Sequence, residues 1–429
     1  MKKDRIMEIL NDWNFWEKDM DVGIKRDGYL KKLETLEKTG QVVAITGVRR
    51  SGKSTLMLQY MKHLADGGVK RKNALYVNLE DPRFSAELSL ELLQEIYEAY
   101  LEFMEPDAKP YIFLDEVQNV NGWEKFARAM HERKEGKIFV SGSSSKLLSK
   151  EFGTVLTGRH ADLAVYPLNF REFLAFNGIE IKDKMDLISK RIKIKRLLGD
   201  FIKHGAFPQV VLSEEKGEIL VRYFDDVIGR DTIERFKVRR ADKLRALANY
   251  YLTNVSSLIA FNRIKKFIGL PFNTVERFSY FLSYAQLIFF VKKFAYSLKE
   301  QEVNPRKVYC IDTGMRNAVC FTLSEDLGKL YENAVFLKLL QDGGDVYYWK
   351  NRGECDFLVR RGRSVGEVIQ VCFDVEKEET KKREVRGLVE AMKKFKIPRG
   401  LVVTEDYESE ERVGKKRIEF VPLWKWLLE

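Results

Sequence analysis

An eight-residue segment in the amino-terminal part of the chain has the residue types of a phosphate-binding loop. Residues 47–54 read GVRRSGKS and fit the pattern G-x-x-x-x-G-K-[ST] without deviation. Glycines let the backbone turn so tightly that successive N–H groups face phosphate oxygens, and a helix that begins at the loop adds positive potential. We therefore expect these residues to bind a nucleoside triphosphate: Gly47, Val48, Arg49, Arg50, Ser51, Gly52, Lys53, Ser54 and Thr55.

The segments on either side of this loop supply the context that the pattern requires. Residues 42–46 are apolar and mostly β-branched, which predicts a buried parallel strand. After the loop, apolar residues recur at helical spacing, at Leu56, Met57, Tyr60 and Leu64. In this setting Lys53 is expected to reach the β- and γ-phosphates as a catalytic cation, and the Ser54 hydroxyl to ligate Mg²⁺.

A second apolar segment, residues 111–118, ends in two adjacent carboxylates, Asp115 and Glu116. An acid at the carboxyl end of a parallel strand near a phosphate loop is where a carboxylate that organises Mg²⁺ belongs. Glu116 is then placed to polarise an attacking water, which indicates hydrolysis rather than nucleotide storage. Residues 74–81 read as a further strand between the phosphate strand and the acidic strand.

Two other segments offer candidates for the same chemistry. Residues 137–149 predict a strand that ends in serines, and Ser141 and Ser143 could sense the γ-phosphate or simply cap a helix. Arg159 is a candidate catalytic cation that neutralises transition-state charge, and its alternative is an arginine remote from the phosphates.

Four blocks in a specific order resemble the archaeal-type AAA ATPases, a family that occurs in archaea and bacteria. The blocks are ITGVRRSGKSTL, FLDEVQNVNGWEKFARAM, SGSSSKLLSKEFGTVLTGR and YPLNFREFL. The resemblance covers nearly the whole chain. It implies ATP rather than GTP as the nucleotide, a polar sensor at the SGS strand end, and a carboxyl-terminal domain of unknown function.

The composition indicates in which compartment the protein is expected and which classes of partner suit it. The chain has 429 residues, a net charge of +11 and 45% hydrophobic residues, with no apolar run long enough to span a membrane and no secretory signal. Its four cysteines lack the close paired spacing of a zinc site or a disulfide framework, so we expect a cytoplasmic protein without membrane contact. Basic residues gather in residues 189–198, 235–245 and 381–396, which suits either nucleic acid or a solvated lysine-rich surface.

The middle of the chain predicts helices and then a winged helix. Asn273, with Glu276 three residues later, is expected to cap its last helix. We expect Val275, Phe278, Leu282 and Ala285 to face the core, and Glu276, Arg277, Tyr280, Ser283 and Tyr284 to face outward. That outer face lacks the cluster of base-reading side chains needed for sequence-specific DNA recognition. Non-specific phosphate contact is the better nucleic-acid hypothesis, through Lys265, Lys266, Lys292 and Lys293, and protein docking competes with it.

The last third resembles the restriction-endonuclease-like fold that such ATPases carry at the carboxyl terminus. In active members, an acid on the first helix, an acid on the second strand and an E-x-K on the third bind Mg²⁺ and activate water. Glu332 and Asp356 match the two acids, but Gln370 and Cys372 stand at the E-x-K positions. Gln370 and Cys372 share one side of a strand. We expect them to point at a former metal site beside Asp356, and nuclease activity to be absent.

These observations together predict an α/β chain built on a P-loop core with a parallel sheet. The expected parts are an AAA-type ATPase domain (1–175), a helical lid-like segment (176–240), a winged-helix-like segment (241–310) and a degenerate endonuclease-like domain (311–429). The expected function is Mg²⁺-dependent ATP hydrolysis that drives a switch or remodeller of a protein partner, with oligomers allowed. An ATP-regulated DNA-binding protein is the alternative, and a metal-dependent nuclease is the third hypothesis.

Overall fold

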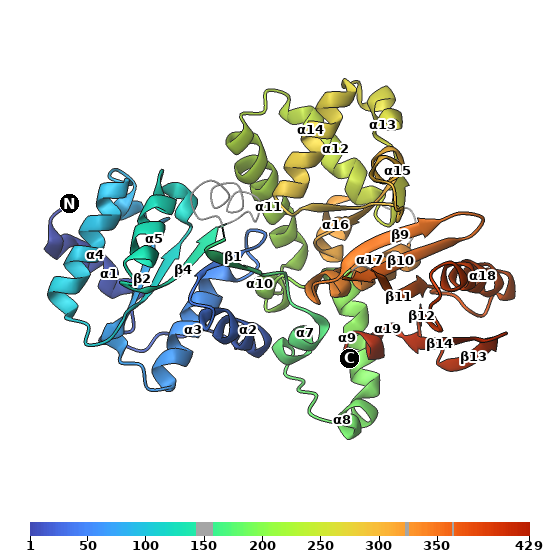
Figure 1. The fold of residues 1–429 in the computed structure, drawn as a ribbon, viewed down its shortest axis with the longest axis horizontal. Coiled ribbons are helices and arrows are strands. Elements are labelled where there is room, and N and C mark those ends of the chain that lie inside the picture. Colours follow the sequence, from blue (N-terminus) through green and yellow to red (C-terminus); the bar gives the residue numbers. More distant parts are fainter. Residues whose placement is uncertain (143–157, 322–325, 363) are drawn as a thin grey trace. The chain divides into compact units, whose positions relative to one another are not determined.

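A computed structural model of the chain describes residues 1–142, 158–321, 326–362 and 364–429. The chain divides into two compact units, Met1–Val165 (unit 1) and Tyr166–Glu429 (unit 2), which Figure 1 shows in blue to green and in green to red.

Unit 1 is built on a parallel sheet, as the sequence predicted, and the sheet has five strands in the order β2-β3-β4-β1-β5. Its strands are β1 (Val42–Thr46), β2 (Ala74–Asn78), β3 (Tyr111–Asp115), β4 (Lys137–Gly142) and β5 (His160–Ala164). Because β4 pairs with both β1 and β3, one strand separates the phosphate-loop strand from the acidic strand. Their carboxyl ends therefore open on the same edge of the sheet.

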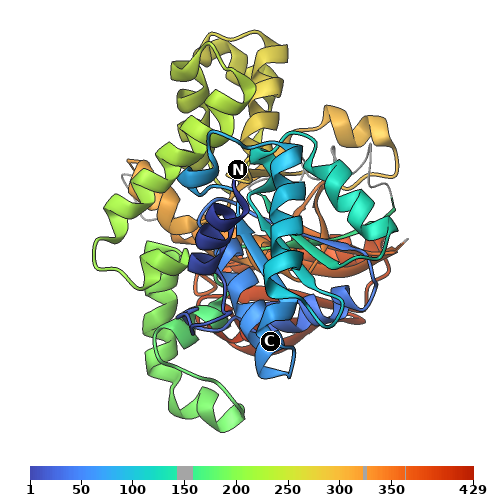
Figure 2. The ribbon, with the colours of Figure 1, turned by 90° about the vertical axis from the view of Figure 1, so that its left-hand side faces the viewer.

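Helices cover both faces of this sheet because successive residues of each strand point to opposite sides. Val42 and Ala44 join an apolar cluster with α1 (Lys3–Trp13), α4 (Leu90–Met104) and α5 (Trp123–Glu132). Val43 and Ile45 join a second cluster with α2 (Asp27–Glu37) and α3 (Lys53–Asp66). Figure 2 shows α1 and α4, in dark blue and light blue, side by side on the viewer's side of the sheet. Short 3₁₀ turns lie at η1 (Arg71–Asn73), η2 (Pro82–Phe84) and η3 (Val117–Asn119).

Unit 2 begins with a helical segment. Its helices are α7 (Phe170–Phe176), α8 (Lys184–Ser189), α9 (Arg191–His204), α10 (Pro208–Val211), α11 (Lys216–Ile228) and the π-helical turn η4 (Gly229–Glu234). A capping box starts α7, since Asn169 accepts the Glu172 N–H and the Glu172 carboxylate accepts the Asn169 N–H.

A helix–strand–helix–helix–strand–helix–strand segment follows, and its three strands pair antiparallel in the order β6-β8-β7. The elements are α12 (Ala241–Thr253), β6 (Ser257–Ile259), α13 (Phe261–Ile268), α14 (Phe272–Tyr284), β7 (Ile288–Val291), α15 (Leu298–Val303) and β8 (Arg306–Cys310). This is the region for which the sequence predicted a winged helix, and that assignment stays a prediction.

Two details of α14 differ from the expectation. The helix begins at Phe272 after Pro271, without a side-chain cap, so the predicted Asn273 cap is wrong. The fixed φ of Pro271 already directs the chain into the helix one residue earlier. Tyr284 is buried rather than outward, because Phe236 packs edge-on against it at 5.1 Å between ring centroids. The four predicted core residues of α14 and its end are buried: Val275, Phe278, Leu282 and Ala285.

The carboxyl-terminal part of unit 2 is a six-stranded mixed sheet in the order β13-β14-β12-β11-β10-β9. Its strands are β9 (Asp345–Lys350), β10 (Glu354–Arg361), β11 (Ser364–Val371), β12 (Arg399–Thr404), β13 (Ser409–Val413) and β14 (Lys416–Pro422). Its helices are α16 (Thr313–Val319), α17 (Leu327–Gln341), α18 (Glu378–Lys394) and α19 (Leu423–Trp426). Within β10, Leu358 joins the apolar cluster under α18, whereas Phe357 contacts Tyr309 of β8. The edge strand β13 was not expected from the sequence.

Candidate functional site

The phosphate loop connects β1 to α3, and two of its positions require glycine. A Cβ on Gly47 would lie 2.1 Å from the carbonyl oxygen of Val165, a contact that no side chain tolerates. Gly52 has φ +95° at the N-cap of α3, in the region that favours glycine. The loop therefore closes tightly against the end of β5 and delivers Lys53 as the first residue of α3.

The Lys53 ammonium is buried inside the loop. It donates to the carbonyl oxygens of Gly47 at 3.2 Å and of Val48 at 3.3 Å, and the residue is 4% exposed. Among the described residues no carboxylate pairs with it. A buried cation held only by neutral carbonyls, at a helix N-terminus, suits the negative charge of a phosphate.

Residues 22–26, a strap that precedes α2, contact the phosphate loop. Arg26 is buried, and its Nη1 donates to the carbonyl oxygen of Ser51 at 3.0 Å, while its guanidinium lies 4.4 Å from the Tyr29 ring centroid. Gln59 of α3 fixes the strap, since its amide group donates to Val22 and Ile24 and accepts the Arg26 N–H. Arg26 was missed from the sequence because no local motif connects it to a loop 25 residues away.

Asp115 lies at the carboxyl end of β3 within a set of hydroxyl donors. The hydroxyl of Tyr76 on β2 donates to its carboxylate at 2.6 Å, and the hydroxyls of Ser141 and Ser54 also hydrogen-bond to it. Burial, and then the neighbouring Glu116 charge, raise the pKa of Asp115. The fold thus brings Ser54 and Asp115 together. Hydroxyl and carboxylate oxygens are hard ligands of the kind Mg²⁺ prefers, so this pair fits that ion.

Glu116 is held next to this group by backbone geometry. It has φ +56°, its N–H donates to the Ser141 Oγ at 3.1 Å, and Gln118 donates to its carboxylate. Ser141 therefore connects both acids of the DE pair. Tyr76 was not among the site residues expected from the sequence, because it lies on β2, which belongs to neither of the two motifs.

Two sequence candidates do not join this group. The carbonyl oxygen of Arg159 accepts the Val42 N–H at the amino end of β1, and the guanidinium of Arg159 pairs with Glu132 at 3.0 Å. The phosphate loop follows the carboxyl end of β1, about 15 Å away along five residues of strand. Arg159 therefore lies away from the phosphate loop of its own chain, and its candidate role in neutralising transition-state charge stays a prediction. Ser143 lies outside the described residues.

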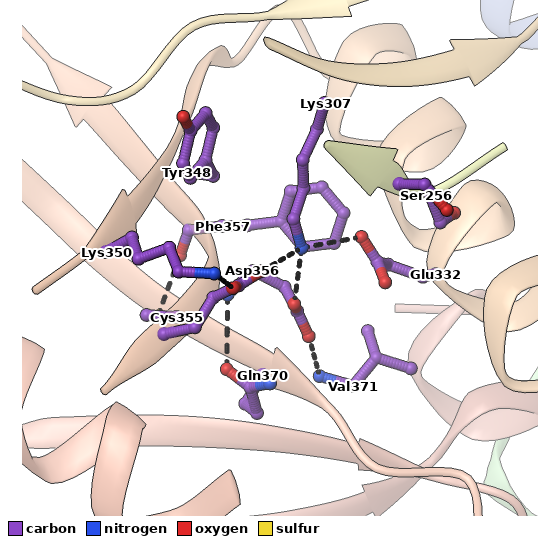
Figure 3. A network of polar contacts seen from close by, with 12 residues as sticks. Ser256, Lys307, Glu332, Tyr348, Lys350, Cys355, Asp356, Phe357, Gln370 and Val371 are labelled. Carbon is purple, nitrogen blue, oxygen red and sulfur yellow. Dashed lines mark hydrogen bonds and ion pairs between the residues drawn. The ribbon is translucent and has the colours of Figure 1, made fainter. Parts of the chain in front are cut away.

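A second polar group lies in unit 2, where the Lys307 ammonium of β8 is surrounded by carboxylates (Figure 3). Its Nζ is 2.7 Å from Asp356, 3.0 Å from Glu354 and 3.1 Å from Glu332. The side chains of Lys307 and Asp356 are 3% and 8% exposed. Burial lowers the pKa of Lys307, but Asp356 and Glu332 outweigh burial and raise it well above its usual value. The ammonium therefore stays charged.

Gln370 and Cys372 take different places around this cluster. The Gln370 side chain accepts the Asp356 N–H at 3.1 Å and donates to Glu384 of α18 at 2.6 Å. Cys372 lies past the end of β11, joins the apolar cluster under α18 and donates to the carbonyl oxygen of Asp374. The expectation that both side chains point at one former metal site stays a prediction: Gln370 contacts the backbone of Asp356, and Cys372 lies one residue past the end of β11 at Val371.

Lys307 was not predicted, because it lies upstream of the region compared with an endonuclease fold. Its signal in the sequence is a lone lysine inside the strand-like run KVYCI. The cation lies between the two acids that would otherwise bind a metal. No cluster of three or more His, Cys, Asp or Glu side chains suited to a metal ion occurs within the described ranges. A cation already between the acids disfavours metal-dependent cleavage at this position.

Two general properties complete the description. All four cysteines are free, and three of them, Cys310, Cys355 and Cys372, are buried. In the part of the chain that the structure describes, no helix is both long enough and apolar enough to cross a membrane.

Comparison with protein families divides the chain into three matched segments. A model described as an AAA domain matches residues 39–174, and two domains of unknown function, DUF8612 and DUF4143, match residues 195–326 and 327–426. The AAA match contains the phosphate loop and the DE pair, so unit 1 carries a P-loop AAA-type ATPase core.

Relatives extend over nearly the full length. The uncharacterized protein MJ1544 of Methanocaldococcus jannaschii is 33% identical over 409 residues, which cover 90% of this chain and 88% of that protein. An uncharacterized protein of Haemophilus influenzae is 27% identical, over 95% of this chain and 99% of that protein.

Solved structures share less of the chain. The Walker-type ATPase paby2304 of Pyrococcus abyssi aligns with a TM-score of 0.44 and 14% identity, over 69% of this chain and 95% of that chain. PCH-2 of C. elegans aligns with a TM-score of 0.26 and 12% identity, over 66% of this chain and 71% of that chain.

Proposed function

The chain belongs to the family of AAA-domain proteins that includes MJ1544 of Methanocaldococcus jannaschii, and from this premise we propose that it hydrolyses ATP in a Mg²⁺-dependent reaction. The observation that carries the proposal is the hydrogen bond between Ser54, directly after the phosphate-loop lysine, and Asp115 at the end of β3. Two motifs 61 residues apart in sequence thus meet through side chains.

Each residue of this group has a proposed role. Lys53 and the N–H groups of the loop bind the β- and γ-phosphates. Ser54 and Asp115 hold Mg²⁺, which neutralises charge on the phosphates when bound. Glu116 orients a water for in-line attack on the γ-phosphate and accepts its proton, while Ser141 keeps the two acids in place.

Two substitutions separate binding from turnover. Lys53→Ala should abolish ATP binding measured by calorimetry. Glu116→Gln, which keeps the side-chain shape, should retain binding but stop phosphate release. Lys62→Ala on the same helix α3 is the matched control and should change neither. Unchanged hydrolysis in Glu116→Gln would refute the role of Glu116, and ATP binding by Lys53→Ala would refute the site.

We further propose that ATP turnover drives a switch or remodeller whose output lies in unit 2 and acts on a protein partner. Exposed apolar side chains on and beside α8 and α9 support a docking role: Met185, Ile188 and Ile192 are 68%, 69% and 88% exposed. A nuclease output has less support, because Lys307 lies between the acids that would bind the metal.

A further inference from the structure

Positive charge is concentrated in residues 241–310, the segment that contains α12 to β8. These 70 residues hold eleven Lys and Arg but only four Asp and Glu, a net +7 out of +11 for the whole chain. One sixth of the sequence therefore carries more than half of its net charge. Two of these cations are neutralised by acids outside the segment, because buried Lys307 contacts Glu354 and Asp356, and Arg245 pairs with Asp225. A surplus of exposed cations on one small fold is what a polyanion-binding surface needs, so the remaining cations decide the argument.

Four cations of this segment lie exposed on two consecutive helices. Arg263, Lys265 and Lys266 are on α13, and Arg277 is on α14. None of the four pairs with a carboxylate anywhere in the described ranges. The polar residues Asn262 and Asn273 are exposed on the same two helices, together with Phe267 and Phe272, which are 58% and 36% exposed.

Two other basic stretches of the chain, residues 189–198 and helix α18, are partly neutralised by carboxylates. In residues 189–198, Lys190 pairs with Asp186, and Lys195 pairs with Asp406. Along α18, Lys382 pairs with Glu378 and Arg386 with Glu390. An ion-paired lysine gains less from a phosphate, because binding must first break the existing pair.

Two lysines of the segment that were expected to contact phosphate are also paired with carboxylates. Lys292 pairs with Glu302, and Lys293 lies 3.2 Å from Glu300, both glutamates being on α15. Lys292 and Lys293 are therefore not candidate phosphate contacts. The candidates are Lys265 and Lys266, together with Arg263 and Arg277.

The connection between α13 and α14 has the form of a helix-turn-helix. Only Gly269, Leu270 and Pro271 separate the two helices, and Gly269 has φ +70°, which glycine adopts without strain. A turn of three to four residues, often with glycine, joins the helices of DNA-binding helix-turn-helix units. This geometry favours nucleic acid over an anionic lipid surface, which needs no such turn.

We propose that α13 and α14 bind the phosphate backbone of duplex DNA without base specificity, through Arg263, Lys265, Lys266 and Arg277. The second helix offers one cation and one acid, Arg277 and Glu276, near its start, so it supplies charge rather than a donor pattern that reads bases. The four cations belong to unit 2 and the proposed ATP site to unit 1, so DNA binding and ATP binding are tested with different substitutions.

The test uses the full chain and a short fluorescent DNA duplex of mixed sequence, with affinity measured by anisotropy from about 50 to 200 mM salt. Changing all four cations to Gln should weaken binding at least about tenfold and lower the salt slope by about one per lost phosphate contact. A scrambled duplex should bind equally well. Circular dichroism and ATP turnover should match the wild type and show that the fold is kept.

The matched control removes the same charge from another helix of unit 2. Lys382, Arg386, Lys393 and Lys394 are exposed on α18, and their change to Gln should leave DNA affinity within about twofold. Equal loss in both quadruple variants would overturn the proposal in favour of net charge alone. Tighter binding of single-stranded DNA would overturn the duplex assignment. Binding only to anionic vesicles would overturn nucleic acid as the partner.

Discussion

The Nζ of Lys307 lies 2.7 Å from Oδ1 of Asp356, and the two residues come from different sheets of unit 2. Glu332 of α17 approaches the same ammonium, so one lysine joins β8, α17 and β10. Burial, and then the Asp356 charge, raise the pKa of Glu332 to about 8. The cation therefore offsets a concentration of acid that the interior would otherwise not tolerate.

Lys307→Met should destabilise the protein strongly, since the variant keeps the side-chain length but leaves buried carboxylates without a cation. Breaking such a buried pair costs about 3–5 kcal/mol. The free energy of unfolding can be measured by urea titration with tryptophan fluorescence. Lys382→Met on exposed α18 is the control. A loss below about 1 kcal/mol for Lys307→Met, which is typical of exposed pairs, would contradict a role in stability.

Tyr76→Phe should weaken Mg²⁺-dependent turnover through Asp115, because the variant loses one hydroxyl donor to that carboxylate. A hydrogen bond to a charged group contributes about 1.5–3 kcal/mol, so the Mg²⁺ concentration for half-maximal turnover should rise about tenfold or more. The acid limb of the pH–rate profile should also move upward. Tyr60→Phe, whose hydroxyl bonds to Glu37 instead, is the matched control and should leave both readouts unchanged.

Arg159→Ala should leave ATP turnover per chain unchanged, because Arg159 lies at the amino end of β5 and pairs with Glu132. Turnover is measured as phosphate release at several protein concentrations, next to Lys53→Ala. Removing a donor that stabilises transition-state charge costs about 100-fold or more. A loss of that size in Arg159→Ala would contradict the geometry within one chain and require another chain to receive this arginine.

Asp312→Asn should remove a pH dependence of stability. Asp312 is 2% exposed and accepts the N–H groups of Ala206 and Met315, and burial raises its pKa to about 6. An acid with a raised pKa in the folded state contributes stability below its ordinary pKa of 3.8, and that contribution is lost as the pH rises through about 6.

Relative to the wild type, the Asp312→Asn variant should therefore gain up to about 3 kcal/mol between pH values of about 4 and 7. Urea titrations of both proteins at the two pH values measure this difference, and the other acids cancel in the comparison. A difference between the two proteins that stays constant with pH would show that burial does not hold the proton on Asp312.

The sequence by itself determined the phosphate loop and the parallel core around it. Residues 47–54 are contiguous, and their chemistry depends on backbone turns and a helix start that form locally. The continuous apolar run at residues 42–46 likewise predicted a buried parallel strand, and both faces of that strand are covered. The meeting of Ser54 and Asp115 followed from one rule, that parallel strands share a carboxyl edge.

Only the tertiary structure decided what surrounds those motifs. In the fold, Arg159 lies at the amino ends of the strands, opposite the phosphate loop, whereas Tyr76 and Arg26 lie beside the candidate site. The fold also placed Lys307 of β8 beside Asp356 of β10, 49 residues along the chain. Sequence patterns report neighbours within a few residues, through periods of 2 and 3.6. Strand order and helix packing choose distant neighbours, because they depend on the burial of the whole chain at once.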